Sequence, residues 1–234
     1  MLIIKEMNKQ GNTYTFIYSV VLVVIVATLL AIISLSLKPL QLKNISNEKR
    51  QNILSSVNIS STAAESITLY NKYITSSFII NEKGEKLEGD AFKVDIALEY
   101  KKPVSDRKLP VFVADIEGKT KYVLPVYGAG LWGAIWGFVS FNEDKNTICG
   151  TIFDHESETP GLGAKITTAN FQNEFKNKKI FENDDLKSIS VKKGGGAKGD
   201  YEVDAISGAT ITSRGVQAML ANYLSCYKQF LNSK

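Results

Sequence analysis

Few residues of this sequence could carry out chemistry on their own. It has one histidine, His155, and two cysteines, Cys149 and Cys226. A closed Cys/His zinc site needs four ligands and an iron–sulfur cluster usually needs four thiolates, so no metal site is expected. The cysteines lack a CxxC spacing and are expected to be separate buried thiols, with one disulfide as the alternative. Redox or group-transfer chemistry would therefore have to be carried by a bound cofactor.

A run of small residues stands directly before the clearest helix of the sequence. The run is Asp204-Ala-Ile-Ser-Gly-Ala-Thr210. The first turn of a helix has free backbone N–H groups and favours negative charge, and small residues let another molecule approach the backbone. The residues alone thus indicate a site for an anion such as phosphate, with an ordinary turn before a helix as the alternative.

Two stretches upstream are also rich in glycine. Glu158-Thr-Pro-Gly-Leu-Gly163 combines a proline with two glycines, which predicts a rigid turn that another group can approach closely. In the stretch 124–133, glycines alternate with bulky residues, so that Leu131 or Trp132 could pack on a flat aromatic ligand. For the Glu158–Gly163 turn, the alternative is a plain Pro-Gly turn. For the other stretch, the alternative is that Trp132 and the nearby Trp136 pack in the protein core, and we expect this of Trp136.

The elements that must position these motifs are a mixture of strands and helices. Runs of β-branched and aromatic residues predict strands at 74–80, 92–100, 111–116, 121–126, 135–141, 147–153, 186–191 and 201–206. The polar turn at 142–146 predicts that the strands 135–141 and 147–153 form a hairpin. Helical spacing predicts helices at 44–57, 62–73, 168–178 and 216–231, the last capped by Thr212 or Ser213. Since the two kinds of element do not alternate strictly, the predicted class is α+β, with an antiparallel sheet and flanking helices.

The N-terminal part contains a long apolar stretch. Phe16 to Leu37 carries no charge, and as a helix it would span about 33 Å, enough to cross a bilayer. Lys38 and Pro39 are expected to end it; a cleaved signal peptide or a core helix are the alternatives. The predicted organisation is a tail at 1–15, a membrane helix at 16–37, a helical juxtamembrane linker at 38–72 and a folded domain at 73–234.

The charge of the chain is nearly balanced. Its 28 basic and 24 acidic residues give a net charge of +4, which does not fit a nucleic-acid-binding protein. Two lysines precede the apolar stretch and four basic residues follow it: Lys5, Lys9, Lys38, Lys43, Lys49 and Arg50. Counted by the positive-inside rule, this difference weakly favours a cytoplasmic folded domain.

The small-residue run resembles a known modification motif. Asp204, Ser207, Gly208, Ala209 and Thr210 match the D-x-x-S-G-A-T motif of the FMN-binding domain family. In that family a flavin transferase joins FMN through its phosphate to the final Thr or Ser. The resemblance implies covalent FMN on Thr210, with Asp204 helping the transferase to recognise or activate the acceptor.

The Glu158–Gly163 turn is similar to a second signature of the same family. The resemblance therefore implies that this turn contributes to the flavin site together with the other glycine-rich stretch. The implied flavin-binding residues outside the modification motif are Glu158, Thr159, Gly161, Leu162, Gly163, Lys165, Leu131 and Trp132.

A third stretch points to one branch of the family. The segment 124–138 and the Gly-Thr-Ile-Phe-Asp-His run at 150–155 resemble the C-type subunits of sodium-translocating NADH:quinone oxidoreductases. This implies an electron-relay flavoprotein of the bacterial inner membrane, single-pass, with a periplasmic flavin domain. We follow the family on topology, because long translocated domains often ignore a small charge excess.

The resemblance also implies a role within a larger complex. FMN would accept an electron from a metal centre elsewhere in the complex and pass it on, through another flavin, to ubiquinone or menaquinone while sodium crosses the membrane. The chain alone is not expected to hold a complete active site: no G-x-G-x-x-G fingerprint follows a strand, and we expect His155 to be a solvated loop residue. The alternatives are the G-type subunit of the Rnf ferredoxin:NAD complex and a membrane-anchored interaction domain without flavin.

Overall fold

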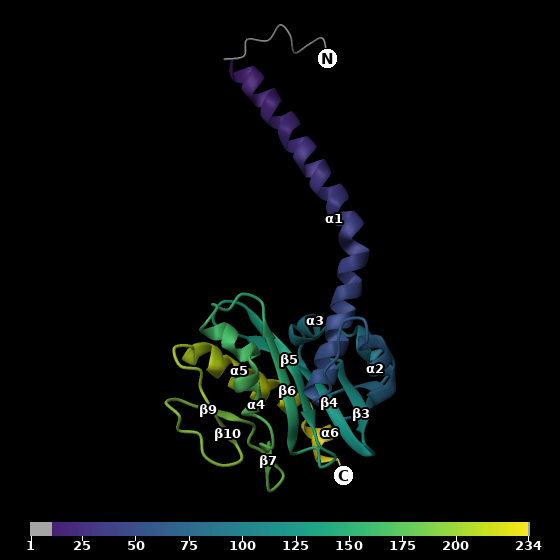
Figure 1. The fold of residues 1–234 in the computed structure, drawn as a ribbon, viewed down its shortest axis with the longest axis vertical. Coiled ribbons are helices and arrows are strands. Elements are labelled where there is room, and N and C mark those ends of the chain that lie inside the picture. Colours follow the sequence, from purple (N-terminus) through teal and green to yellow (C-terminus); the bar gives the residue numbers. More distant parts are fainter. Residues whose placement is uncertain (1–10, 234) are drawn as a thin grey trace. The chain divides into compact units, whose positions relative to one another are not determined.

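The structure is a computed structural model, and it describes residues 11–233 (Figure 1). Most of the expected N-terminal tail, with Lys5 and Lys9, lies outside the described residues. The chain divides into two compact units between Ser46 and Asn47. Helix α1, Asn12–Ser56, begins in the first unit and ends in the second.

Helix α1 contains the apolar stretch found in the sequence. Within the described residues it is the one helix long and apolar enough to cross a membrane, and none of its most apolar window is buried in the protein. The expectation that Lys38 and Pro39 end this helix is wrong, because α1 continues through Pro39 to Ser56. A proline removes one backbone hydrogen bond, and here the helix resumes beyond it.

The second unit is built around an antiparallel sheet of six strands, in the order β2-β1-β3-β4-β5-β6. Each strand pairs with its neighbours in antiparallel register, and the hairpin predicted from the sequence is β5–β6. The strands are β1 (Ile74–Ile80), β2 (Lys86–Leu87), β3 (Leu109–Ile116), β4 (Lys119–Ala129), β5 (Ala134–Phe141) and β6 (Ile148–His155).

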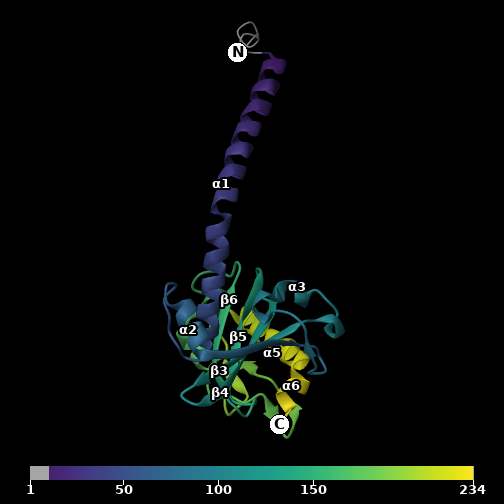
Figure 2. The same cartoon turned by 90° about the vertical axis from the view of Figure 1, so that its right-hand side faces the viewer.

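Both faces of this sheet are covered, which explains why its central strands read as apolar runs. On one face Val111, Leu124 and Val139 join a large core with α5 (Thr210–Cys226). On the other face Phe112 and Val123 pack with the last residues of α1. Figure 2 shows α5 and α6 (Lys228–Asn232) on one side of the sheet and α2 (Ser66–Tyr73) on the other. Successive side chains of a strand therefore enter two different cores.

Smaller elements surround the main sheet. Two short pairs are β7–β8, which is antiparallel, and β9–β10, which is parallel. Their bounds, with those of the remaining short helices, are β7 (Phe181–Glu182), β8 (Asp185–Leu186), β9 (Ser190–Lys192), β10 (Glu202–Asp204), η2 (Ala91–Lys93), α3 (Ile96–Tyr100), η3 (Val104–Asp106), η4 (Gly163–Thr167) and α4 (Ala169–Asn173). Cys149 and Cys226 are both free, and only Cys226 is buried.

Several predicted element boundaries are wrong for identifiable reasons. The expected strand 92–100 is instead η2 and α3, because Asp90 and Asp95 accept hydrogen bonds from backbone N–H groups and start helical turns. The expected helix 168–178 is reduced to α4, and the expected strand 186–191 is divided between β8 and β9.

The C-terminal helix also differs from its prediction. It begins at Thr210 rather than after Thr212 or Ser213, so these two residues lie in its first turn and do not cap it. It ends at Cys226, and after Tyr227 the shorter α6 follows. The earlier start places Thr210 on the helix itself, which matters for its chemistry.

The C-terminal end of α1 belongs to the core of the second unit. Ile53 and Leu54 are fully buried, although the sequence predicts a linker in this segment. Ser56, in the last turn of α1, accepts a hydrogen bond through its carbonyl oxygen from the Ser140 hydroxyl of β5. The final residues of α1 are therefore part of the folded unit.

We expect Leu54→Ala to destabilise the second unit by about 2–5 kcal/mol, since it removes a fully buried side chain and leaves a cavity. Chemical unfolding of the full chain in detergent measures this cost. Ile45→Ala, on the same helix at a side chain that is 61% exposed, is the matched control and should cost little. Equal costs would contradict this role of α1.

Candidate functional site

The small-residue motif forms a loop between β10 and α5. Asp204 ends β10, and Thr210 is the first residue of α5. Inside the loop, the Ser213 hydroxyl accepts a hydrogen bond from the Ile206 N–H at 3.0 Å and donates one to the Ala209 carbonyl at 2.9 Å. Ser213 of α5 thus holds the loop at two backbone groups, Ile206 and Ala209, which precede Thr210.

The four hydroxyl side chains around this loop differ in their availability. Thr212 and Ser213 are 1% and 0% exposed, and both hydroxyls are engaged in hydrogen bonds. Thr210 is half-buried and Ser207 exposed. Neither of their hydroxyls bonds to another described residue. Thr210 is thus the one accessible hydroxyl on the first turn of α5.

The buried carboxylate of Glu158 joins the motif loop to the two glycine-rich stretches. One oxygen accepts hydrogen bonds from the N–H groups of Leu131 at 2.7 Å and Trp132 at 2.9 Å. The other accepts a hydrogen bond from the Thr212 hydroxyl at 2.6 Å. Glu158 is 4% exposed, so its carboxylate points into the protein. One side chain therefore holds together three segments that are distant in sequence.

The surroundings of Glu158 favour its charged form. Burial raises its pKa, but the hydrogen bonds from Thr212, Trp132 and Leu131 and the nearby His155 outweigh this effect and hold the pKa below its ordinary value of 4.5. Hydrogen bonds to a charged acceptor are stronger than those between neutral groups. The three donors are therefore held firmly at neutral pH.

Gly163 leaves the space that this carboxylate needs. A Cβ atom there would lie 2.7 Å from the Thr212 hydroxyl oxygen and closer still to a Glu158 oxygen. The second glycine of the turn is therefore required by the Glu158–Thr212 hydrogen bond.

His155 is not the solvated loop residue that the sequence predicts. It ends β6 and is half-buried. Its Nδ1 atom accepts a hydrogen bond from the Glu158 N–H at 3.2 Å. This hydrogen bond holds the start of the turn that carries Glu158, so His155 helps to position the site.

Large apolar side chains are exposed around the same site. They are Leu131, Trp132, Leu162 and Ile211, which are 46%, 66%, 43% and 60% exposed. Glu158 ties the first two to the start of α5. Gly208, at a φ of +79°, lies under Leu162, and Ile211 follows Thr210 on α5. Exposed apolar side chains that gather in this way mark a binding surface. The expectation that Trp136 lies in the core is wrong, because it is half-buried on β5 and belongs to neither buried core cluster.

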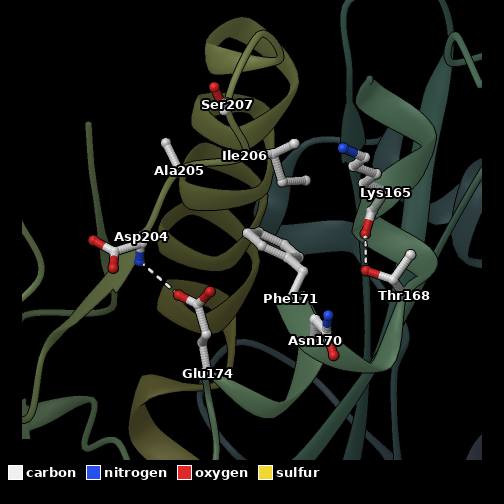
Figure 3. A pocket seen from close by; sticks show the side chains of 9 residues that line it. All are labelled: Lys165, Thr168, Asn170, Phe171, Glu174, Asp204, Ala205, Ile206 and Ser207. Atoms are coloured by element: carbon white, nitrogen blue, oxygen red, sulfur yellow. Dashed lines mark hydrogen bonds between the residues drawn. The ribbon is translucent and has the colours of Figure 1, made fainter. Parts of the chain in front are cut away.

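A cavity of about 310 Å³ is lined in part by the motif loop (Figure 3). Its lining residues are Lys165, Thr168, Asn170, Phe171, Glu174, Asp204, Ala205, Ile206 and Ser207. Glu174 accepts a hydrogen bond from the Asp204 N–H at 2.7 Å, and burial, with the charge of Asp204 adding to it, raises the pKa of Glu174. The cavity thus holds a carboxyl group that is partly desolvated.

The Asp204 side chain faces the glycine-rich loop between β9 and β10. It accepts a hydrogen bond from the Ala197 N–H at 2.8 Å. The backbone N–H of Asp204 donates to Glu174, so hydrogen bonds hold both the side chain and the backbone of this residue. Asp204 therefore orients the start of the motif loop.

The remaining expected residues lie at the surface of the turn. Thr159 is exposed, and its carbonyl oxygen accepts hydrogen bonds from the N–H groups of Leu162 and Ala164. Gly161 is exposed at a φ of +77°, which favours glycine. Lys165 is exposed and, like Ser207, lines the cavity. In the described part of the chain, no group of His, Cys, Asp and Glu side chains is placed to hold a metal.

Comparison with known families gives the class of this protein. Residues 130–225 match the model of the FMN-binding domain. The matched segment contains the Glu158 turn, the motif loop and most of α5. The chain thus joins an apolar helix, suited to membrane anchoring, to an FMN-binding domain.

Relatives along the whole chain narrow this class. The C-type subunit of the Na(+)-translocating NADH-quinone reductase of Haemophilus ducreyi is 31% identical over 228 residues, covering 90% of this chain and 89% of the relative. Its counterpart in Neisseria meningitidis is 28% identical and covers 97% of this chain and 96% of the relative. The chain therefore belongs to the family of C-type subunits of the Na(+)-translocating NADH-quinone reductase.

Solved structures agree with this assignment. The crystal structure of the C-type subunit from Parabacteroides distasonis is 48% identical, with a TM-score of 0.80, and covers 85% of this chain and 98% of that one. NqrC of Shewanella oneidensis is 28% identical, with a TM-score of 0.71, and covers 80% and 96%. These neighbours confirm the α+β class, and the relatives favour the sodium-translocating reductase over the Rnf alternative.

The sequence does not reveal the roles of three residues that build this site. Its pattern predicts Thr212 and Ser213 as helix caps and does not single out Ile211. The available signal is a pair of adjacent hydroxyl residues, Thr212 and Ser213, that follows Thr210 and Ile211. Only the bond to Glu158, 54 positions away, gives Thr212 its role.

We expect Gly163→Ala to destabilise the domain and to separate Thr212 from Glu158, because the added methyl group occupies the place of their hydrogen bond. The cost should be about 1–3 kcal/mol, as for overpacking in a filled interior. Thermal unfolding measures it. Gly196→Ala, whose Cβ would lie 3.4 Å from its nearest neighbour, is the control and should be nearly neutral. A neutral Gly163→Ala would contradict the packing described.

We expect Glu158→Gln to cost about 1–3 kcal/mol at neutral pH, because it turns a charged acceptor of three hydrogen bonds into a neutral amide. The pKa of Glu158 is lowered in the folded state, so its contribution is present above about pH 4.5 and is lost as the pH falls through the lowered pKa.

The difference in unfolding free energy between the wild type and Glu158→Gln should therefore narrow below pH 4.5. Urea unfolding over a pH series measures it. Glu143→Gln, at an exposed carboxylate, is the control and should show little difference at any pH. If the difference in unfolding free energy between the wild type and Glu158→Gln stays constant with pH, Glu158 is not ionised in the folded protein.

Proposed function

We propose that this chain carries FMN joined through its phosphate to the Thr210 hydroxyl, and that it relays electrons toward quinone within the Na(+)-translocating NADH-quinone reductase. The observation that carries the proposal is the state of the hydroxyl groups around the motif loop. Thr210 is accessible on the first turn of α5, whereas Thr212 and Ser213 are buried and already hydrogen-bonded.

The start of α5 suits a phosphate group. The first N–H of the helix to find a backbone partner is that of Ser213, which donates to the Ala209 carbonyl. The N–H groups of Thr210, Ile211 and Thr212 therefore have no helical acceptor. A phosphate on Thr210 would lie beside these donors and at the positive end of the helix dipole. Ser207, although exposed, lies in the loop outside the helix.

The exposed apolar side chains suit the flavin ring. Leu131, Trp132, Leu162 and Ile211 are exposed on segments that meet at the motif loop and the start of α5, and they offer flat or aliphatic contacts for an aromatic ring system. FMN supplies chemistry that the protein side chains lack, since it accepts either one electron or two. The task of the chain is to hold the ring in position and leave an edge open to partner subunits.

Other residues of the expected site have supporting roles in this proposal. Glu158 holds the site through its hydrogen bonds to the protein, and Thr159, Gly161 and Gly163 shape the turn under Leu162. Asp204 orients the motif loop, and its role toward a flavin transferase is to present that loop in one conformation. Lys165 lines the same cavity as Ser207, where its positive charge would attract a phosphate.

We further propose that residues 16–37 of α1 cross the bacterial inner membrane and that the flavin-carrying unit is periplasmic. The length and apolar character of α1 support the anchor. A covalent bond supports the periplasmic side, because outside the cytoplasm a dissociated flavin would be lost. The partners are then the other subunits of the reductase, and a flavin transferase during maturation.

We expect Thr210→Ala to abolish covalent FMN and Thr210→Ser to retain it, since only the second keeps a hydroxyl for the phosphoester. Both variants should be produced together with a flavin transferase. Mass spectrometry of peptides containing residue 210, with flavin fluorescence after denaturing electrophoresis, measures attachment. Covalent FMN on Thr210→Ala would refute the assignment, and a wild type without flavin under the same conditions would refute the proposal as a whole.

A further inference from the structure

Thr212 is a buried hydroxyl residue beside the attachment point. It lies two positions after Thr210, in the first turn of α5, and is 1% exposed. Its hydroxyl donates to one Glu158 oxygen at 2.6 Å. Such a deeply buried side chain cannot be reached by ligands or partner proteins, so any role it has must act through its neighbours.

The neighbour that transmits this role is Glu158. While one of its oxygens accepts from Thr212, the other accepts from the backbone N–H groups of Leu131 and Trp132. A continuous set of hydrogen bonds thus runs from the first turn of α5 to the backbone of two exposed apolar residues. It connects the helical turn that would carry the flavin to the residues that would contact its ring.

This connection leaves little freedom for rearrangement. Glu158 is 4% exposed, and Gly163 borders the carboxylate and the Thr212 hydroxyl so closely that no side chain fits between them. A buried carboxylate that loses one partner is costly, so the arrangement is kept only while all donors are present. The distance between the start of α5 and the Leu131–Trp132 backbone is therefore set by these bonds.

We propose that Thr212 is a positioning residue for the flavin on Thr210: through its hydrogen bond to Glu158 it fixes the first turn of α5 against Leu131 and Trp132 and so orients the flavin ring. This inference rests on the proposed attachment of FMN to Thr210. It adds that the orientation of the ring depends on the Thr212 hydroxyl, and that a side chain of the same shape without a hydroxyl does not suffice.

The test compares Thr212→Val with Thr212→Ser in the full chain, purified in detergent after production with a flavin transferase. Valine keeps the size of threonine and removes the hydroxyl, whereas serine keeps the hydroxyl. The fluorescence anisotropy and visible circular dichroism of the covalent FMN report how firmly the ring is held. Mass spectrometry confirms that each sample carries flavin on Thr210.

A control separates orientation from stability. Val216, one turn further along α5, is 0% exposed and belongs to the core. Val216→Ala should lower stability by about 1–3 kcal/mol without touching the Thr212–Glu158 bond. Thermal unfolding of each variant allows comparison at matched fractions of folded protein.

We expect Thr212→Val to shift the equilibrium between held and mobile flavin about tenfold toward the mobile form, the factor for one hydrogen bond to a charged group. Anisotropy and circular dichroism should fall together, while Thr212→Ser and Val216→Ala stay close to the wild type. Combining Thr212→Val with Glu158→Gln should add little further loss, because both changes break the same connection.

Wild-type signals in Thr212→Val, or an equal loss in Val216→Ala, would overturn the positioning role while leaving flavin attachment intact. If Thr212→Val folds but takes up no flavin, whereas Thr212→Ser does, the positioning role is supported at the attachment step. A wild type without covalent FMN on Thr210 would instead refute the proposed function itself.

Discussion

The buried carboxylate of Glu158 is the interaction on which the site depends. It accepts hydrogen bonds from the backbone N–H groups of Leu131 and Trp132 and from the hydroxyl of Thr212, while the backbone N–H of Glu158 donates to His155 Nδ1. A charge in a site that is 4% exposed is tolerable only with such partners. Removing the Thr212 hydroxyl would leave one carboxylate oxygen without a donor, so the link between α5 and the other two segments depends on that hydroxyl.

The rest of the unit provides a frame in which this interaction can form. The antiparallel sheet is covered on both faces, by α5 on one side and by the end of α1 with α2 on the other. The strand pair β5–β6 brings the end of β6, with His155, beside the start of β5. α5 packs on the same sheet near the end of β4, which places Thr212 within reach of Glu158.

The chemistry of the molecule follows from what its side chains lack. One histidine and two separate, free cysteines offer no redox centre, and His155 is used to hold a turn. A single accessible hydroxyl at the start of α5, surrounded by exposed apolar side chains, is suited to hold a cofactor that does the electron transfer. Burial of the neighbouring hydroxyls gives a physical reason for the proposed attachment at Thr210 rather than at Thr212 or Ser213.

Neighbouring residues in the sequence encode the local features of this protein, and these could be predicted without a structure. They are the uncharged stretch from Phe16 to Leu37, the β5–β6 hairpin and the motif that ends at Thr210. The strand predicted at 92–100 is wrong because two aspartates, Asp90 just before it and Asp95 within it, accept backbone hydrogen bonds that start helical turns. The continuation of α1 through Pro39 is not predicted, because a proline removes one backbone hydrogen bond of a helix and is therefore taken as its end.

The way in which the site is held is a property of the packed fold. Glu158 turns inward, Thr212 donates to it across 54 positions, and Ile53 and Leu54 enter the core instead of forming a linker. Each of these depends on contacts between residues far apart in the chain, and neither composition nor periodicity encodes such contacts. The physical reason is that a buried carboxylate is stabilised only by donors within hydrogen-bond distance. Thr212 comes within that distance of Glu158 only once the sheet and α5 have packed together.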